Sequence, residues 1–236
     1  ALNYKFSLDY WEIDYENRIE AQSAQALLNE NPNGPAITRN VDGDLIGVTT
    51  TYFNEESTEV AGIDLDLSYS FPINKFGDFD IRIVGTNLIK FSTPLVESGV
   101  SKMQNRVGRF NYDSHMHSLP RNRINLFFGI NGKNFRHQLN TRYIDCYKNT
   151  RAITGLGLTY GYKNKVDSFV VHDYCLKSSE TFTPDFFNGK LNFGFCIINI
   201  NDESAPQLYD APDFSFDTRL HDPRGRMFSI NFNLEL

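Results

Sequence analysis

The end of the chain alternates between apolar and polar residues with a period of two. From residue 226 to residue 236, every second side chain is a large hydrophobic group, and the side chains between them are almost all polar. Successive side chains of a β-strand point to opposite faces, so the pattern predicts a strand with one apolar face. A soluble sheet can contain one such strand. A membrane-spanning barrel needs the pattern in every strand, because one face meets lipid and the other meets water.

The same alternation recurs along the rest of the chain. It is found at residues 2–10, 63–71, 79–84, 123–130, 135–147, 169–176 and 191–197. With the terminal segment, these predict about eight strands of roughly ten residues, the length that crosses a bilayer at a tilt. We therefore expect an all-β fold, an antiparallel transmembrane β-barrel segment in which residues 1–236 form one incomplete domain.

The alternation also assigns side chains to two environments. The lipid-facing candidates are Ile63, Leu65, Leu67, Phe193, Phe195, Phe228, Ile230, Phe232 and Leu234. The candidates for the water-filled lumen are Asp64, Asp66, Arg82, Arg121, Arg123, Arg136 and Arg142.

The connections between these segments alternate in length. Residues 72–75, 131–133 and 183–188 are short and rich in Pro, Gly and Asn, as in tight turns. The other connections are long, at residues 14–57, 89–120, 149–165 and 201–225. This order is typical of a membrane barrel, with periplasmic turns at one rim and extracellular loops at the other. Inside the first loop, residues 19–28 suggest a helix, and residues 45–53 suggest a strand that extends the barrel wall above the membrane.

Composition narrows the possible classes of protein. The net charge of −6 argues against a general nucleic-acid binder, which needs a basic surface. No apolar run approaches the ~18 residues of a transmembrane helix. The 20 Phe and 12 Tyr suit strands and aromatic girdles. The three cysteines match neither a disulfide framework nor a zinc motif, so we expect isolated small side chains. No signal peptide is visible at Ala1, so we expect the natural N-terminus to lie upstream.

Several local sequences resemble those of TonB-dependent outer-membrane receptors. The similar segments are residues 8–19, residues 61–71, residues 119–126, residues 194–206, and residues 209–226 before the last strand. Their order and spacing agree with that family over the whole chain. One departure is Leu236, where the family usually ends on an aromatic residue.

The resemblance implies that the chain is the C-terminal part of a receptor barrel of about 22 strands, without its N-terminal plug. It implies energy-coupled uptake of a large or scarce ligand, such as a ferric siderophore, cobalamin or an oligosaccharide, across the outer membrane of a Gram-negative bacterium. The implied partners are membrane lipid, the plug and missing strands, TonB acting through the plug, the barrel-assembly machinery and a small-molecule ligand. Neither catalysis nor a cofactor is expected.

Other interpretations stay open at this point. The inward arginines either attract an anionic ligand or pair with acids of the plug, which we favour. His115 and His117 have a metal-like spacing, but a solvated loop is the simpler reading. The glycines of residues 155–161 are not expected to hold phosphate, because no helix is expected to follow them. The two alternative functions are a small passive porin-like barrel and a soluble or surface β-sheet binding module.

Overall fold

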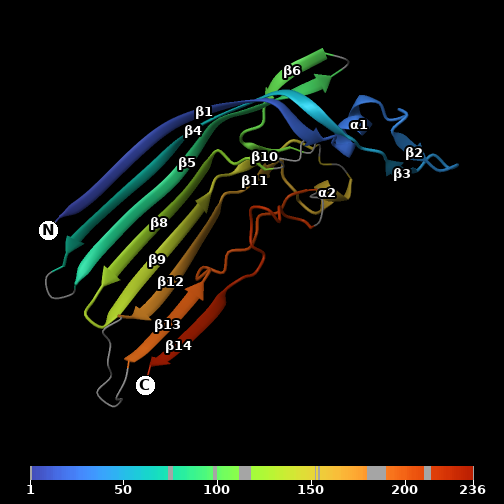
Figure 1. Cartoon of the computed structure of the whole chain (residues 1–236). Coiled ribbons are helices and arrows are strands. Elements are labelled where there is room, and N and C mark those ends of the chain that lie inside the picture. The colour runs from blue at the N-terminus through green and yellow to red at the C-terminus, as the bar shows by residue number, and fades with distance from the viewer. Residues whose placement is uncertain are drawn as a thin grey trace.

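The computed structural model describes residues 2–73, 77–97, 100–111, 118–151, 153, 155–179, 190–209 and 214–235. Most of them form one long, curved sheet (Figure 1). Its main strands are β1 (Asn3–Ala21), β4 (Tyr52–Pro72), β5 (Asp78–Glu97), β8 (Asn122–Asn131), β9 (Phe135–Ile144), β12 (Phe169–Ser178), β13 (Lys190–Ile198) and β14 (Met227–Glu235). Each of the eight predicted strands is therefore confirmed.

These strands pair antiparallel in chain order, from β1 at one edge to β14 at the other, and the sheet is not closed. The connections 73–77, 132–134 and 179–189 lie at one end, which we call the turn end. The connections 22–51, 98–121, 145–168 and 199–226 lie at the other, which we call the loop end. Both chain termini are at the turn end (Figure 1). The order of short and long connections agrees with the prediction for the strand pairs β4–β5 and β8–β9, while the predicted turn at 183–188 lies outside the described residues.

The register aligns the predicted faces across all eight strands. One continuous row of cross-strand partners runs Tyr4, Tyr69, Ile81, Phe128, Leu139, Tyr174, Ile197, Phe228. A row on the opposite side runs Asn3, Ser70, Asp80, Gly129, Gln138, Cys175, Cys196, Ser229. Because the side-chain period is two, a slip of one residue would mix these rows. We call the two sides the apolar face and the polar face.

Three strands are about twice as long as the sequence pattern predicts. β1, β4 and β5 have 19, 21 and 20 residues, so residues 14–21 continue a strand where a loop was expected. Beyond Tyr10 the two sides of β1 exchange character. Charged residues at 12, 14 and 16 follow the apolar positions, while Trp11 and Ile13 follow the polar ones. The simple alternation ends at this exchange, so the pattern predicts only the first half of β1.

The first long connection contains α1 (Ala24–Glu30), β2 (Ile37–Arg39) and β3 (Leu45–Val48). The helix lies within and just beyond the expected patch, and the Ser23 hydroxyl caps it by accepting a hydrogen bond from the Ala26 amide. The expected extension of the wall at residues 45–53 is wrong for its first part. β3 pairs with β2 in a separate hairpin, and only residues 52 and 53 belong to the sheet. Of the described residues, no helix is long and apolar enough to cross a membrane.

Two small apolar cores lie at the loop end of the part of the chain that the structure describes. One packs Val60 and Phe91 of the sheet against Val107 of the following loop, with Trp11 beside them. The other involves β7 (Arg109–Phe110), β10 (Tyr147–Asn149) and β11 (Lys165–Val166), where Phe110, Tyr147, Val166 and Leu208 are buried. β6 (Val100–Asn105) extends β5 as a hairpin, and α2 (Leu156–Thr159) is a single turn. The long connections are therefore packed onto the sheet end.

A disulfide joins two of the cysteines that were expected to be isolated. Cys175 of β12 and Cys196 of β13 are directly opposed, with their Cα atoms 4.2 Å apart, and form a bond. Among the described residues, Cys146 is free. The expectation was wrong because the sequence spacing does not give the strand register that places the two thiols side by side.

Candidate functional site

The polar face carries a ladder of charged and amide side chains across the central strands. The Arg82 guanidinium donates to both carboxylate oxygens of Asp66, at 3.1 and 2.9 Å. One step toward the loop end, the Thr86 hydroxyl donates to Asp64 at 2.6 Å. These contacts link β4 to β5, so they fix the positions of the two predicted acidic side chains on this wall.

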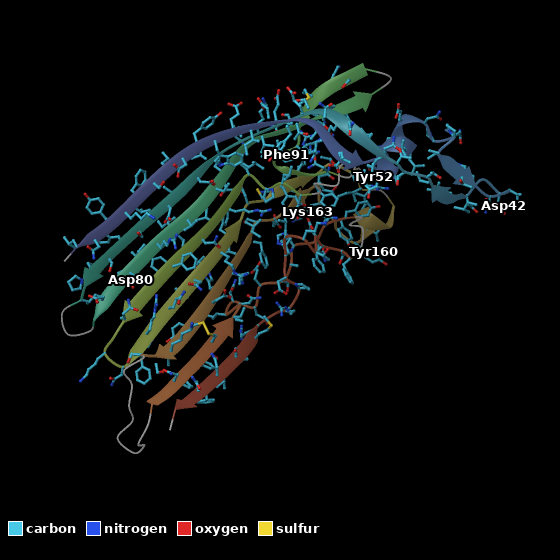
Figure 2. All side chains as sticks on the ribbon, viewed as in Figure 1. Asp42, Tyr52, Asp80, Phe91, Tyr160 and Lys163 are labelled. Carbon is cyan, nitrogen blue, oxygen red and sulfur yellow. A yellow bond between two sulfur atoms is a disulfide. The ribbon has the colours of Figure 1, made fainter. Side chains whose placement is uncertain are left out.

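The predicted arginines divide into two groups. Arg82 and Arg136 lie toward the turn end, next to a hollow of about 460 Å³ that is also lined by Lys5, Asp80 and Gln138. Arg82 is the only one of the two with an ion pair among the described residues. Asp80, labelled in Figure 2, accepts a hydrogen bond from the amide of Asn131. The hollow therefore presents three cationic side chains and one carboxylate on a concave patch of the polar face.

The other arginines lie toward the loop end. Arg142 forms an ion pair with Asp173 on the neighbouring strand, at 3.3 Å. Asp173 also accepts from the backbone amide of Asn199, which places this pair beneath the last long connection. Arg121 and Arg123 are exposed and have no ion pair with any residue that the structure describes. The structure thus brings the arginines onto one face, but not into a single cluster.

The last long connection is held over the polar face by a buried histidine. His221 is 3% exposed, stacks on Tyr147 and meets the edge of Phe169. Burial lowers the pKa of His221 from 6.5 to about 4. The Asp217 carboxylate opposes this shift, and Arg123 adds to it. The imidazole is therefore neutral at pH 7, and its Nδ1 has no hydrogen-bond partner among the described atoms.

The same connection is tied to β12 and is closed on itself just before β14. The side-chain oxygen of Asn201 accepts a hydrogen bond from the His172 backbone amide, and its side-chain nitrogen donates to the Val170 carbonyl, both on β12. Asp202 accepts from the Arg226 amide at 2.7 Å. Farther along, hydrogen bonds from the Arg224 guanidinium lower the pKa of Asp222 to about 2. These contacts give structural roles to polar residues of the family-like segments 194–206 and 209–226.

Large side chains project from the outer parts of the loops. Tyr160 and Phe214 are 72% and 63% exposed, while Tyr162 packs edge-on against Tyr209. Tyr160 and Lys163 lie at the loop end in Figure 2. Such side chains can stack on planar groups of a ligand or bond it.

The predicted lipid-facing residues share the apolar face. Ile63, Leu65 and Leu67 oppose Tyr10, Leu8 and Phe6 of β1. On the last two strands, the partners are Phe193 with Phe232, Phe195 with Ile230, Ile197 with Phe228, and Leu191 with Leu234. Phe228, Ile230 and Phe232 are all more than 60% exposed. An apolar surface of this extent needs a nonaqueous neighbour.

Comparison with known proteins identifies this arrangement. A family described as TonB dependent receptor-like, beta-barrel matches residues 1–194. The chain belongs to the TonB-dependent receptor family. Among solved structures, a mutant of the ferric enterobactin receptor PfeA from Pseudomonas aeruginosa matches 94% of this chain with a TM-score of 0.51 and 13% sequence identity. The match spans 27% of that receptor's chain, and at this identity it supports the fold alone. No curated protein sequence matches.

TonB-dependent receptors are outer-membrane transport receptors of Gram-negative bacteria and do not form an enzyme class. The structure also bears on other features that the sequence suggested. As expected, no helix follows the glycines at 155–161 in the described residues; the four-residue turn α2 lies within this stretch, and Gly157 packs against the Tyr209 ring. His115, His117 and the whole predicted turn at 183–188 lie outside the described residues.

Several residues of this site are not singled out by the sequence pattern. Lys5, Asp80 and Gln138 line the hollow, and they could have been found because they occupy polar positions of the alternating pattern. His221 had no such signal, because its burial depends on contacts with Tyr147 and Phe169 from distant strands.

Proposed function

We propose that this chain forms the C-terminal part of the β-barrel of an outer-membrane receptor that imports a scarce ligand with energy delivered through TonB. The observation that carries the proposal is the continuous apolar row across eight strands, with polar side chains on the opposite side, in a chain of this family. From Phe71 to Ile63, five apolar positions span ~26 Å along β4, or ~20 Å across a membrane at the usual tilt. That height is close to the apolar band of bacterial barrels.

In this proposal the loop end faces the outside and the turn end faces the periplasm. The exposed apolar face contacts lipid, which argues against a soluble binding module, because water would meet Phe228 and Phe232 directly. The open edges at β1 and β14 suit pairing with further strands, since unpaired backbone groups are costly in lipid. Both features favour a receptor wall over a small independent pore.

The ligand classes compatible with the family are ferric siderophores, cobalamin and oligosaccharides. The exposed aromatic side chains of the loops, with Tyr160 and Phe214 among them, are suited to capture such ligands by stacking and hydrogen bonding. The proposal is tested by deleting the complete gene and measuring uptake of labelled ligands of each class in cells with and without TonB. Loss of one TonB-dependent uptake activity is expected. Uptake that is unchanged for every class, or recovery of the protein outside the outer membrane, would contradict it.

On the polar face, we infer that the hollow near Arg136 receives the plug. Arg136 and Lys5 have no ion pair among the described residues, and both line the hollow, so acidic plug side chains would complete it. A photo-crosslinking residue at position 136 of the complete receptor is expected to label peptides N-terminal to this chain. The matched control is the same residue at position 102, which lies on the β6 hairpin at the loop end. Labelling of bound ligand alone would favour the alternative, an anion-attracting lumen.

A further inference from the structure

The apolar face contains a groove at the turn end. It has a volume of about 880 Å³ and lies across β5, β8, β9 and β12. Its floor and sides are large hydrocarbon side chains: Phe79, Phe128, Ile130, Phe135 and Leu139. These residues come from neighbouring strands in register, since Phe79 opposes Ile130 and Phe128 opposes Leu139. The groove therefore offers an apolar bed of the kind that acyl chains occupy.

The part of this groove on β9 and β12 carries polar groups. His137 and Tyr174 also line it, and the His137 Nδ1 lies 2.7 Å from the Tyr174 hydroxyl. The imidazole and the phenol lie on the apolar face, where their polar atoms are costly in lipid unless they find partners. Their mutual hydrogen bond satisfies only part of this capacity, because the second imidazole nitrogen and the remaining lone pairs of the hydroxyl stay available.

A cation lies where the groove meets the turn between β8 and β9. Lys133 and Asn134, in the connection between β8 and β9, complete the lining. Lys133 is exposed and makes no ion pair with any residue in the described ranges. The Ser179 hydroxyl donates a hydrogen bond to the backbone carbonyl of Lys133, so this contact does not involve the ammonium group. The ammonium group is thus free to meet an anion that approaches the groove from the level of the turn.

We propose that this groove binds one phospholipid of the membrane leaflet at the turn end. The acyl chains lie over Phe79, Phe128 and Leu139, the phosphate meets Lys133 at the turn, and the His137–Tyr174 pair, farther along the strands, bonds the ester groups of the lipid. The chemistry is an apolar bed with a cation at the turn and two hydrogen-bonding groups beside it, which matches a lipid with a phosphate headgroup. The inference rests on the proposed function, because an outer-membrane wall is what brings this face into contact with phospholipid.

The test uses the complete receptor, extracted from outer membranes in mild detergent and titrated with phosphatidylglycerol. Native mass spectrometry is expected to show one tightly held phospholipid. In Lys133→Glu, and in Lys133→Ala combined with His137→Leu, we expect the bound fraction to fall about tenfold, because a charge-assisted contact to phosphate is lost. Lys177→Glu is the matched control. Its register partner is Arg136, so it lies at a similar height on the polar face, and binding should be unchanged.

The outcomes distinguish a failure of the lipid site from a failure of the proposed function. If the receptor is folded in the outer membrane and active in uptake, but Lys133→Glu retains the lipid as well as the unaltered protein does, the lipid site is refuted alone. Retention of lipopolysaccharide instead of phospholipid would also overturn it, because that would place the other leaflet at the groove. Absence of the complete protein from the outer membrane would refute the proposed function itself.

Discussion

Replacing Leu67 with arginine tests the assignment of the apolar face to lipid. Leu67 is the central one of the five apolar positions of β4, and its cross-strand partners are Phe6 and Ile83. Four residues separate it from either border of the band, or ~13 Å along the strand in each direction. An arginine at this depth should destabilise the barrel by about 2–4 kcal/mol, because the guanidinium must be moved into hydrocarbon. That range corresponds to about 30- to 800-fold in the folding equilibrium.

Two variants on the same strand calibrate the effect. Phe71→Arg, at the border of the band, should cost only about 0–1 kcal/mol because its side chain can reach the interface. Ser70→Arg, on the polar face opposite Asp80, should be close to neutral. The measurement is equilibrium unfolding in urea of the complete receptor, folded into phospholipid vesicles. If Leu67→Arg unfolds at the same urea concentration as Ser70→Arg, the two faces have been assigned wrongly.

Three further predictions concern other parts of the chain. Replacing Cys175 and Cys196 with alanine should lower the unfolding free energy by about 2–4 kcal/mol, measured in urea, with reduction of the unaltered receptor giving the same loss. Because the folded-state pKa of His221 is depressed to about 4, the protein should be fully stabilised above pH 6.5 and lose up to about 3 kcal/mol as the pH falls to 4. His221→Phe should flatten this slope in limited proteolysis of the loops, and an unchanged slope would assign it to another group. Gly62→Ala should cost about 1–3 kcal/mol, because the new methyl group would overlap the Trp11 ring; its cost should shrink when Trp11 is first replaced by leucine.

The sequence predicts the part of the fold in which each strand separates an apolar from a polar environment. All eight strands, their order of short and long connections, and the faces of residues such as Asp66 and Leu67 follow from the period of two. The period of two does not predict the rest of β1 beyond Tyr10, because the apolar side chains change faces there. Trp11 there packs toward the loop core, while Glu12 is exposed.

What the sequence does not predict depends on which distant segments meet. The disulfide requires the register of β12 against β13, and the spacing of Cys175 and Cys196 along the chain does not give it. The burial of His221 likewise requires the last connection to fold back over Tyr147. The division of the arginines into two groups follows from their heights on the wall, which only the register sets.

The disulfide between β12 and β13 also bears on how the chain reaches the membrane. Cys175 and Cys196 are 21 residues apart, so oxidation closes a small covalent ring before or after the strands enter the bilayer. If it closes first, this hairpin arrives as a preformed pair with its register already chosen, and the remaining strands add to a fixed template. In the proposed outer-membrane location, the order of oxidation and insertion therefore determines whether β12 and β13 enter the bilayer separately or as a covalently joined pair.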